Sequence, residues 1–513
     1  MSGNLKKSVV NTGFMYGKMV VSMVTTFVGT RIVLEQLGAE DFGLYNLIAG
    51  ITAMLGFFRS SLSTSNQRYL SLALGAEDNK RLQEVFNSSK VLHLVLSISL
   101  IVALEVVGIY LIYYKLDIPP NSTELALIIF QFLIFDIAFS ITSIPYSALI
   151  SSHEDIHVIA ILYTLDAIGK FAVALLLIFI QSNQLIVYAA GLTVTFTLSR
   201  MALQLYCKHK YKNLSYKFVF RGNKGLMKEI FFFTGYSSFG AISDLVRTQG
   251  IGVVLNLFFG VLINAAYALV LQINGQLRFF ASSLMMTLNP QIIKAEGSGD
   301  RVKMLELALQ STKFSFFILS FVSIPIYWQL PNILDIWLKD VPKYTLELAR
   351  LIIIQALIYQ LTSGIHTAIN SIGNIKKYQI ISSFIYLMTL PLGYFTLKAG
   401  YGVSSILYIS IAIEIIVFCF RIQYLNKLSH FPIVDFLKKT FRYTLLPVIT
   451  ATIIIIGFYK SISELNQYLA ITVAFVISSL TSITSIYFIG LGKDEQSLLI
   501  KQFNLFYAKY TGI

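Results

Sequence analysis

Residues 38–62 read GAEDFGLYNLIAGITAMLGFFRSSL, and residues 260–284 read GVLINAAYALVLQINGQLRFFASSL. A shift of 222 positions (260 minus 38) aligns the two stretches without a gap and brings their shared Phe-Phe and Ser-Ser-Leu segments together. The match extends to residues 85 and 307 through Ala73, Gly75, Asp78 and Glu84, which meet Ala295, Gly297, Asp300 and Glu306. Apolar bias does not explain matches at Gly, Ser and Asp. A period this long excludes a solenoid and indicates a duplicated half.

The composition indicates that this duplicated chain lies in a membrane. Of its 513 residues, 56% are hydrophobic and only 13% are charged, with a mean hydropathy of +0.70. Soluble domains carry about 25% charged residues, so most of this surface must face something other than water. The net charge of +14 comes from basic residues clustered between apolar runs, which favours a membrane face over a nucleic-acid partner.

About fourteen apolar segments are long enough to cross a bilayer as helices of about 20 residues. Helices are expected because a lipid-exposed backbone must satisfy its own hydrogen bonds. The predicted spans are 11–34, 44–68, 89–113, 123–147, 157–181, 184–207, 229–256, 262–288, 313–334, 345–370, 378–398, 402–424, 443–461 and 467–490. The first is interpreted as a retained helix and not as a signal peptide, because no small-residue cleavage site follows it.

The loop charges predict the orientation and the domain organisation. Lys and Arg gather before the first span and in the loops that join an even-numbered span to the next, except the loop between the fourth and fifth spans, which has none. Both termini are therefore expected in the cytoplasm. Six spans in each repeat predict two lobes related by an axis along the membrane normal. We expect a first lobe at 1–207, a basic cytoplasmic linker at 208–228, a second lobe at 229–424, and a final helix pair with a tail at 425–513.

The motifs that could indicate catalysis do not support an enzyme. His153-Glu154-Asp155-Ile156-His157 fits H-E-x-x-H, but no third zinc ligand accompanies it, so a polar loop is the better interpretation. The sequence lacks a G-x-x-x-x-G-K-[ST] loop for nucleotide phosphates. Cys207 and Cys419 are far apart and suggest neither a disulfide nor a metal site. We therefore expect no catalytic residues, no metal and no cofactor.

The informative residues are charges inside apolar spans, which usually face a cavity because each costs several kcal/mol in lipid, about 2.5–3.5 on insertion scales. Arg59 and Arg278 lie near mid-span, at repeat positions that share one helix face. Other charges inside the predicted spans include Arg31, Asp136, Glu414, the pair Asp166 and Lys170, and the pair Asp244 and Arg247. Each pair could instead neutralise itself within one helix. Arg68, Arg200 and His366 are expected to snorkel to the cytoplasmic ends.

The segment Thr30-Arg31 … Leu37-Gly38-Ala39-Glu40-Asp41-Phe42-Gly43-Leu44-Tyr45-Asn46, followed by an arginine-bearing second helix, resembles the start of bacterial polysaccharide flippases. These belong to the multidrug/oligosaccharidyl-lipid/polysaccharide exporter superfamily. Similar landmarks are Asn264-Ala265-Ala266-Tyr267, Leu288-Asn289-Pro290 and Ile333-Leu334-Asp335-Ile336-Trp337-Leu338. The resemblance covers the whole chain. It implies translocation of a polyprenyl-diphosphate-linked oligosaccharide of the O-antigen or capsule type to the outer leaflet of a bacterial cytoplasmic membrane.

The resemblance also implies roles for the charged residues. Arg59, Arg278, Arg247, Lys170 and Arg31 are the candidate diphosphate-binding cations, because arginine forks match phosphate oxygens. Asp136, Asp166, Asp244 and Glu414 are candidate ion-coupling or structural acids, and Asn256, Asn264, Gln272 and Asn274 are candidate sugar contacts. Expected partners are the lipid-linked substrate, membrane lipids, a polysaccharide polymerase and glycosyltransferases. The alternatives are a cation-coupled multidrug antiporter of the same superfamily and a peptidoglycan-precursor flippase.

Overall fold

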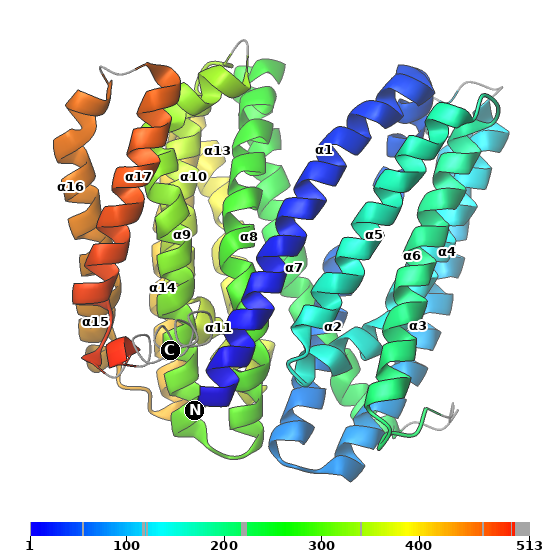
Figure 1. The fold of residues 1–513 in the computed structure, drawn as a ribbon, viewed down its shortest axis with the longest axis horizontal. Helices are drawn as coiled ribbons and strands as arrows, with labels where there is room; N and C mark the ends of the chain where they lie inside the picture. The colour runs from blue at the N-terminus through cyan, green and yellow to red at the C-terminus, as the bar shows by residue number, and fades with distance from the viewer. Residues whose placement is uncertain are drawn as a thin grey trace, which may run out of the picture. The chain divides into compact units, whose positions relative to one another are not determined.

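A computed structural model describes residues 2–53, 56–114, 118, 122–216, 223–338, 341–463, 466–493 and 495–497. These residues form helices and short connections, with no β-strand among them. The helices are α1 (Ser2–Ala53), α2 (Gly56–Gly75), α3 (Asn79–Tyr114), α4 (Thr123–Ser152), α5 (Ile156–Leu176), α6 (Gln184–Lys210), α7 (Lys224–Phe259), α8 (Val261–Gly297), α9 (Arg301–Trp337), α10 (Thr345–Gln360), α11 (Ser363–Ile372), α12 (Lys376–Leu387), α13 (Thr389–Lys398), α14 (Ser405–Ser429), α15 (Ile433–Thr440), α16 (Leu446–Ser463) and α17 (Gln467–Ser485) (Figure 1).

The predicted all-α membrane fold is confirmed. Every predicted span overlaps one of these helices or two consecutive ones. In the described part of the chain, ten helices are long and apolar enough to cross a bilayer, and α10 with α11, bent by 42°, would make an eleventh. The helices extend beyond the predicted spans because hydropathy detects only the apolar part of each helix. α3, for example, begins at Asn79 and carries Lys80 and Arg81 ahead of its apolar run.

The backbone repeats its conformation at the positions that the sequence repeat aligns. Gly38 interrupts α1 with φ 75° and ψ 172°, and Gly260, which is 222 residues later, separates α7 from α8 with φ 74°. A side chain would be strained in this region of backbone space, so both repeats need glycine there. Next, Glu77 and its equivalent Gly299 both have positive φ, of 54° and 78°.

The same turn then starts a helix in each repeat. The Asp78 carboxylate accepts a hydrogen bond from the backbone N–H of Arg81 at 2.8 Å, and Asp300 accepts one from Lys303 at 3.0 Å. Each aspartate thus caps the first turn of the following helix, α3 or α9. The Gly and Asp matches of the sequence repeat are therefore explained by turn geometry and helix capping.

The chain divides into two compact units. Unit 1 holds Met1–Ile242, Met286–Met304 and Asn370–Ile380, and unit 2 holds Ser243–Met285, Leu305–Ile369 and Ile381–Ile513. The boundaries within α7 and α8 fall inside continuous helices. In unit 1, α4 packs against α2, α3 and α6, and α1 packs along α5. A core of apolar residues lies between them, including Ile129, Phe130 and Leu177.

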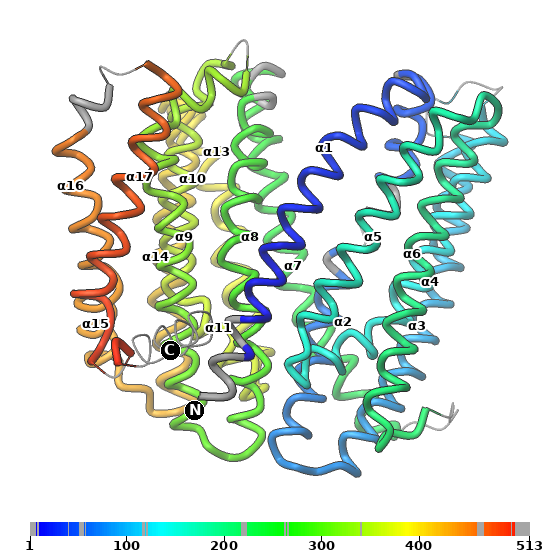
Figure 2. Tube along the Cα trace, in the orientation of Figure 1, coloured from blue at the N-terminus to red at the C-terminus, as the bar shows by residue number. Residues whose placement is uncertain are grey.

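Unit 2 contains the helices that hold the candidate site. α14 packs against α10 and α13 around a core that includes Leu255, Val270 and Ile406. The final pair, α16 and α17, packs side by side, as Figure 2 shows. The chain therefore places parts of α7, α8, α10, α12 and α14 in the unit that holds Arg247, Arg278 and Glu414.

Candidate functional site

The site is built on Asp244 and Arg247 of α7. Their spacing of three residues puts both side chains on one helix face, and Arg247 Nη2 lies 2.7 Å from Asp244 Oδ1. Arg247 is buried, whereas the Asp244 side chain is 43% exposed. The ion pair within one helix that the sequence suggested is therefore present. Arg247 does not pair with Asp244 alone, however, because it also faces a second carboxylate.

That second carboxylate is Glu414 of α14, which is 1% exposed. Its Oε2 lies 3.5 Å from Arg247 Nη1, an ion pair longer than a hydrogen bond. Its Oε1 accepts a 2.9 Å hydrogen bond from the Tyr386 hydroxyl of α12. Tyr386 also lies under the Arg247 guanidinium, which is 4.4 Å from the ring centroid. Glu414 is thus held by groups from two other helices, as a buried carboxylate requires.

Arg421 of α14 extends the cluster. Its Nη2 donates to the Tyr386 hydroxyl at 3.1 Å, and its Nη1 donates to Thr362 Oγ1 at 2.9 Å. Its guanidinium stands over the Tyr359 ring, 4.9 Å from the centroid. The Tyr386 hydroxyl therefore accepts from one arginine and donates to Glu414, so it links the two charges.

Arg278 of α8 is the most exposed arginine of the cluster. Its Nη1 lies 4.0 Å from Asp244 Oδ2, and its guanidinium stands over the Tyr359 ring, 4.5 Å from the centroid. The Arg278 side chain is 37% exposed, unlike those of Arg247 and Arg421. The cluster holds three arginines and two carboxylates, Asp244 and Glu414, which leaves one positive charge (3 − 2 = +1).

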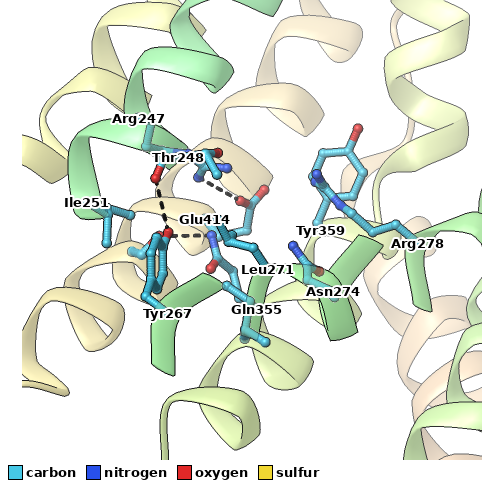
Figure 3. A pocket seen from close by; sticks show the side chains of 13 residues that line it. Arg247, Thr248, Ile251, Tyr267, Leu271, Asn274, Arg278, Gln355, Tyr359 and Glu414 are labelled. Atoms are coloured by element: carbon cyan, nitrogen blue, oxygen red, sulfur yellow. Dashed lines mark hydrogen bonds and ion pairs between the residues drawn. The ribbon is translucent and has the colours of Figure 1, made fainter. Parts of the chain in front are cut away.

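A small polar cavity of about 30 Å³ opens beside the cluster (Figure 3). Arg247, Glu414, Arg278, Asn274 and Gln355 line it with Tyr267 and Tyr359. Figure 3 shows the Arg278 and Tyr359 side chains together at one end and Arg247 with Glu414 at the other. The cavity is partly open and has room for water.

The other predicted charges lie in unit 1, where Asp136 interacts electrostatically with Asp166 and Lys170. Lys170 and Asp166 of α5 pair at 2.8 Å, which is the self-neutralised arrangement. Asp136 of α4 is half-buried, and its Oδ1 makes no hydrogen bond to the described residues. Arg59 of α2 is exposed. Arg31 is also exposed and pairs with Glu35 one helical turn away at 2.8 Å, which is a surface ion pair.

The predicted sugar contacts differ in where they lie. Asn274 lines the cavity, and its Oδ1 is buried without a hydrogen bond to the described residues. Gln272 is exposed and Asn256 is half-buried, and neither lines the cavity. The side chain of Asn264 lies outside the described part of the structure. Gln355 instead supplies an amide at the cavity, where it donates to Ser410 Oγ at 2.9 Å.

The loop that fits H-E-x-x-H is the centre of an ion-pair network in unit 1. Asp155 lies 3.0 Å from Lys7 Nζ and 2.9 Å from Lys210 Nζ, and it accepts a 2.7 Å hydrogen bond from the Tyr211 hydroxyl. Glu154 pairs with Lys294 at 2.6 Å. Burial alone would raise the pKa of Asp155, but the three donors lower it to about 2.

Arg68 and Arg200 do not snorkel as expected. Arg68 is buried and donates from Nε to the carbonyl of Asn370 at 2.6 Å and from Nη2 to that of Ser371 at 3.2 Å. It therefore caps the C-terminus of α11, where a cation is favoured. Arg200 is buried and donates to the Tyr163 hydroxyl at 2.7 Å. Packing partners from other helices hold both guanidinium groups inside the protein.

Sequence reasoning missed Arg421, Tyr386 and Tyr359. Arg421 lies seven residues after Glu414, two helical turns along the same face of α14, and this spacing could have revealed it. The tyrosines carry no comparable signal, because the chain holds 29 of them and only packing decides which ones meet a guanidinium.

Comparison with known proteins agrees with this fold. Residues 17–176 match the sequence model of the family described as MatE. No curated protein matches the sequence. Three similar solved structures each cover 83% of this chain over 97% of their own length. They are a MATE protein in the straight conformation (15% identity, TM-score 0.71), an outward-facing multidrug resistance MATE family transporter of the MOP superfamily (13%, 0.69) and a MOP superfamily transporter from Pyrococcus furiosus (13%, 0.68). At this identity they show that the fold is shared.

Proposed function

We propose that the chain is a MOP-superfamily transporter that moves a polyprenyl-diphosphate-linked oligosaccharide from the cytoplasmic to the outer leaflet of a bacterial cytoplasmic membrane. The family match, the shared fold and the apolar helices support a multi-pass transporter. A sugar headgroup cannot cross hydrocarbon unaided, because each hydroxyl would lose its hydrogen bonds to water. The proposal assigns a lipid-linked anion as the substrate, with both termini in the cytoplasm.

The observation that carries the proposal is the excess of arginine in unit 2. Arg247, Arg278 and Arg421 outnumber Asp244 and Glu414, and Arg278 presents its guanidinium at an accessible surface. A guanidinium fork binds two phosphate oxygens at once, and it remains charged at any physiological pH. A cationic drug would be repelled by the same group. The site therefore favours an anionic headgroup such as a diphosphate.

One of the similar structures is relevant to this choice. The MOP superfamily transporter from Pyrococcus furiosus is described as having a binding pocket of reverse polarity that suggests a different function. One protein with this fold thus has a pocket of reversed polarity. For the present chain, the net positive cluster of unit 2 supports the anionic substrate. A peptidoglycan precursor carries the same lipid diphosphate, so the cluster accommodates either glycan.

A cation-coupled multidrug antiporter is the second candidate. The MatE match of residues 17–176 and the solved MATE structures favour it. Its acids would be Asp166 and Asp136 of unit 1, since Asp166 Oδ1 and Asp136 Oδ1 are both buried without a hydrogen bond to the described residues. Against it, Lys170 already neutralises Asp166.

Reconstitution into liposomes separates the two candidates. The first arm measures the movement of a fluorescent polyprenyl-diphosphate-linked sugar between leaflets, and the second measures uptake of a cationic dye under a proton or sodium gradient. We expect activity in the first arm, reduced at least tenfold by Arg278→Ala. Dye uptake without lipid movement would establish the antiporter instead.

Arg301→Ala is the matched control for this assay. Arg301 also pairs with a glutamate, Glu296, but it lies at the exposed start of α9 and not in the cluster. Its loss should leave lipid movement unchanged. Arg59→Ala tests the exposed arginine of unit 1 in the same assay, and we expect it to slow lipid movement without changing membrane levels. Equal rates for Arg278→Ala and Arg301→Ala would contradict the assignment of the cluster.

A further inference from the structure

Asp244 occupies the position between two arginines where a bound anion would be coordinated. Its Oδ1 lies 2.7 Å from Arg247 Nη2, and its Oδ2 lies 4.0 Å from Arg278 Nη1. One carboxylate thus bridges two guanidinium groups from α7 and α8. A phosphate group binds arginine pairs in the same way, through two oxygens that accept from separate forks.

The two carboxylates of the cluster differ in how firmly they are held. Glu414 is 1% exposed and accepts a hydrogen bond from Tyr386, so it is fixed by its surroundings. Asp244 is 43% exposed, and the hydrogen bond that its carboxylate accepts from a side chain comes from Arg247 of its own helix. The half-exposed Asp244 therefore has fewer contacts to lose when it moves than the buried Glu414 has.

The cavity beside the cluster is lined by Arg247 and Arg278. The Asp244 carboxylate already lies against Arg247 Nη2 and Arg278 Nη1. An anion that binds the two guanidinium groups through these atoms therefore exchanges with the Asp244 carboxylate. The charges agree with this exchange. With Asp244 the cluster carries +1 (three arginines and two acids), and without it the cluster carries +2, which matches the two charges of a diphosphate diester.

We propose that Asp244 is an internal competitor for the anion site: its carboxylate holds Arg247 and Arg278 in the empty state and is displaced when a diphosphate binds. This inference rests on the proposed function for the identity of the anion. It gives Asp244 a role opposite to that of a cation-coupling acid. Removing its charge strengthens anion binding, whereas removing a coupling acid abolishes transport.

The test measures binding of inorganic pyrophosphate to the purified full-length protein in detergent by isothermal titration calorimetry. Asp244→Asn should bind pyrophosphate at least about tenfold more tightly than wild type, the equivalent of one competing charge-assisted hydrogen bond. Adding Arg278→Ala to Asp244→Asn should remove the gain. Asp435→Asn is the matched control, because Asp435 of α15 pairs with Lys439 at an exposed surface of the same unit.

Unchanged or weaker pyrophosphate binding by Asp244→Asn overturns the inference, and so does an equal gain in Asp435→Asn. If Asp244→Asn does not yield a monodisperse protein, Asp244→Ser removes the same charge with a smaller side chain and is measured in its place. The proposed function is tested separately by lipid movement. A gain in pyrophosphate binding without lipid movement would retain the anion site and reject the lipid substrate. Lipid movement without a gain in pyrophosphate binding by Asp244→Asn would retain the lipid substrate and reject the proposed role of Asp244.

Discussion

Gly75 and Gly297, which are equivalent in the internal repeat, make reciprocal contacts within unit 1. A Cβ on Gly75 at the end of α2 would overlap the carbonyl of Lys294, and a Cβ on Gly297 at the end of α8 would overlap the carbonyl of Leu72. Leu72 and Lys294 are themselves 222 residues apart. Each helix end therefore contacts the other through the same pair of positions, which is the pattern of a local two-fold relation. The two glycines allow the backbones to touch.

Alanine at either glycine should destabilise the protein. Gly75→Ala and Gly297→Ala each force two helix ends apart, and overpacking of this kind costs about 1–3 kcal/mol. The unfolding temperature in detergent, followed by fluorescence or light scattering, should fall by several degrees. Gly17→Ala is the control, because nothing lies near a Cβ at Gly17 in α1 and alanine is the better helix former. Equal unfolding temperatures for Gly75→Ala and Gly17→Ala would contradict the close contact.

Arg68 should matter for stability and not for substrate binding. Arg68→Met keeps the apolar stem but removes the hydrogen bonds that Arg68 donates to the carbonyls of Asn370 and Ser371, and the loss of such buried bonds costs about 1–3 kcal/mol each. We expect a lower unfolding temperature and unchanged pyrophosphate affinity in the folded fraction. Arg301→Met, at an exposed ion pair, provides the comparison. A pyrophosphate affinity that falls with Arg68→Met would place Arg68 in the binding site instead.

Acid should weaken the network around Asp155. Its pKa is lowered to about 2 in the folded protein, from an ordinary value of 3.8. A carboxyl with a lowered folded-state pKa contributes stability above its unfolded pKa and loses it as the pH falls through the folded value, so the loss runs from about pH 4 to about pH 2. The contribution is about 2 kcal/mol.

Asp155→Asn checks this dependence. The variant should be less stable than wild type at pH 7, and the difference should shrink as the pH falls below 4. Unfolding temperatures measured from pH 7 to pH 3 give the result. Asp435→Asn, at an exposed pair, should follow the wild-type curve. Wild-type and Asp155→Asn curves that coincide throughout this range would show that the ion pairs with Lys7 and Lys210 do not stabilise the fold.

The Tyr386 hydroxyl should be needed to hold the Glu414 side chain in place. Tyr386→Phe removes a donor to the carboxylate and an acceptor for Arg421, and leaves both groups buried. We expect a loss of about 1–3 kcal/mol in stability and slower lipid movement. Tyr408→Phe, at an exposed tyrosine of α14, is the matched control. Wild-type stability in Tyr386→Phe would show that Glu414 does not depend on this hydrogen bond.

The sequence by itself determined the class of the fold and its internal repeat. Apolar runs of bilayer length must be helical, because no other structure satisfies the backbone within such a segment in lipid. The structure explains the Gly and Asp matches as turns and helix caps, which depend on the residue itself and its immediate neighbours. Gly38 with Gly260 and Asp78 with Asp300 behave alike in the structure for that reason.

The sequence also indicated which charges within a helix would pair. Asp166 with Lys170 and Asp244 with Arg247 are set by helical spacing, which the sequence states directly. It could not indicate that Arg247 would also face Glu414, nor that Arg278 would reach Asp244, because these contacts join residues on separate helices. Only the packing of those helices brings such groups together.

Tertiary structure alone decided which charges form a site. Arg59 and Arg278 look equivalent in the sequence, yet Arg278 joins a cluster, whereas Arg59 is exposed and makes no ion pair with the described residues. Tyr386 entered the cluster because its hydroxyl on α12 reaches both Glu414 and Arg421 of α14. Hydropathy and spacing act along one helix, whereas the charge balance of a site depends on which helices meet. The sequence thus determined the helices, and their packing determined the net charge of the site.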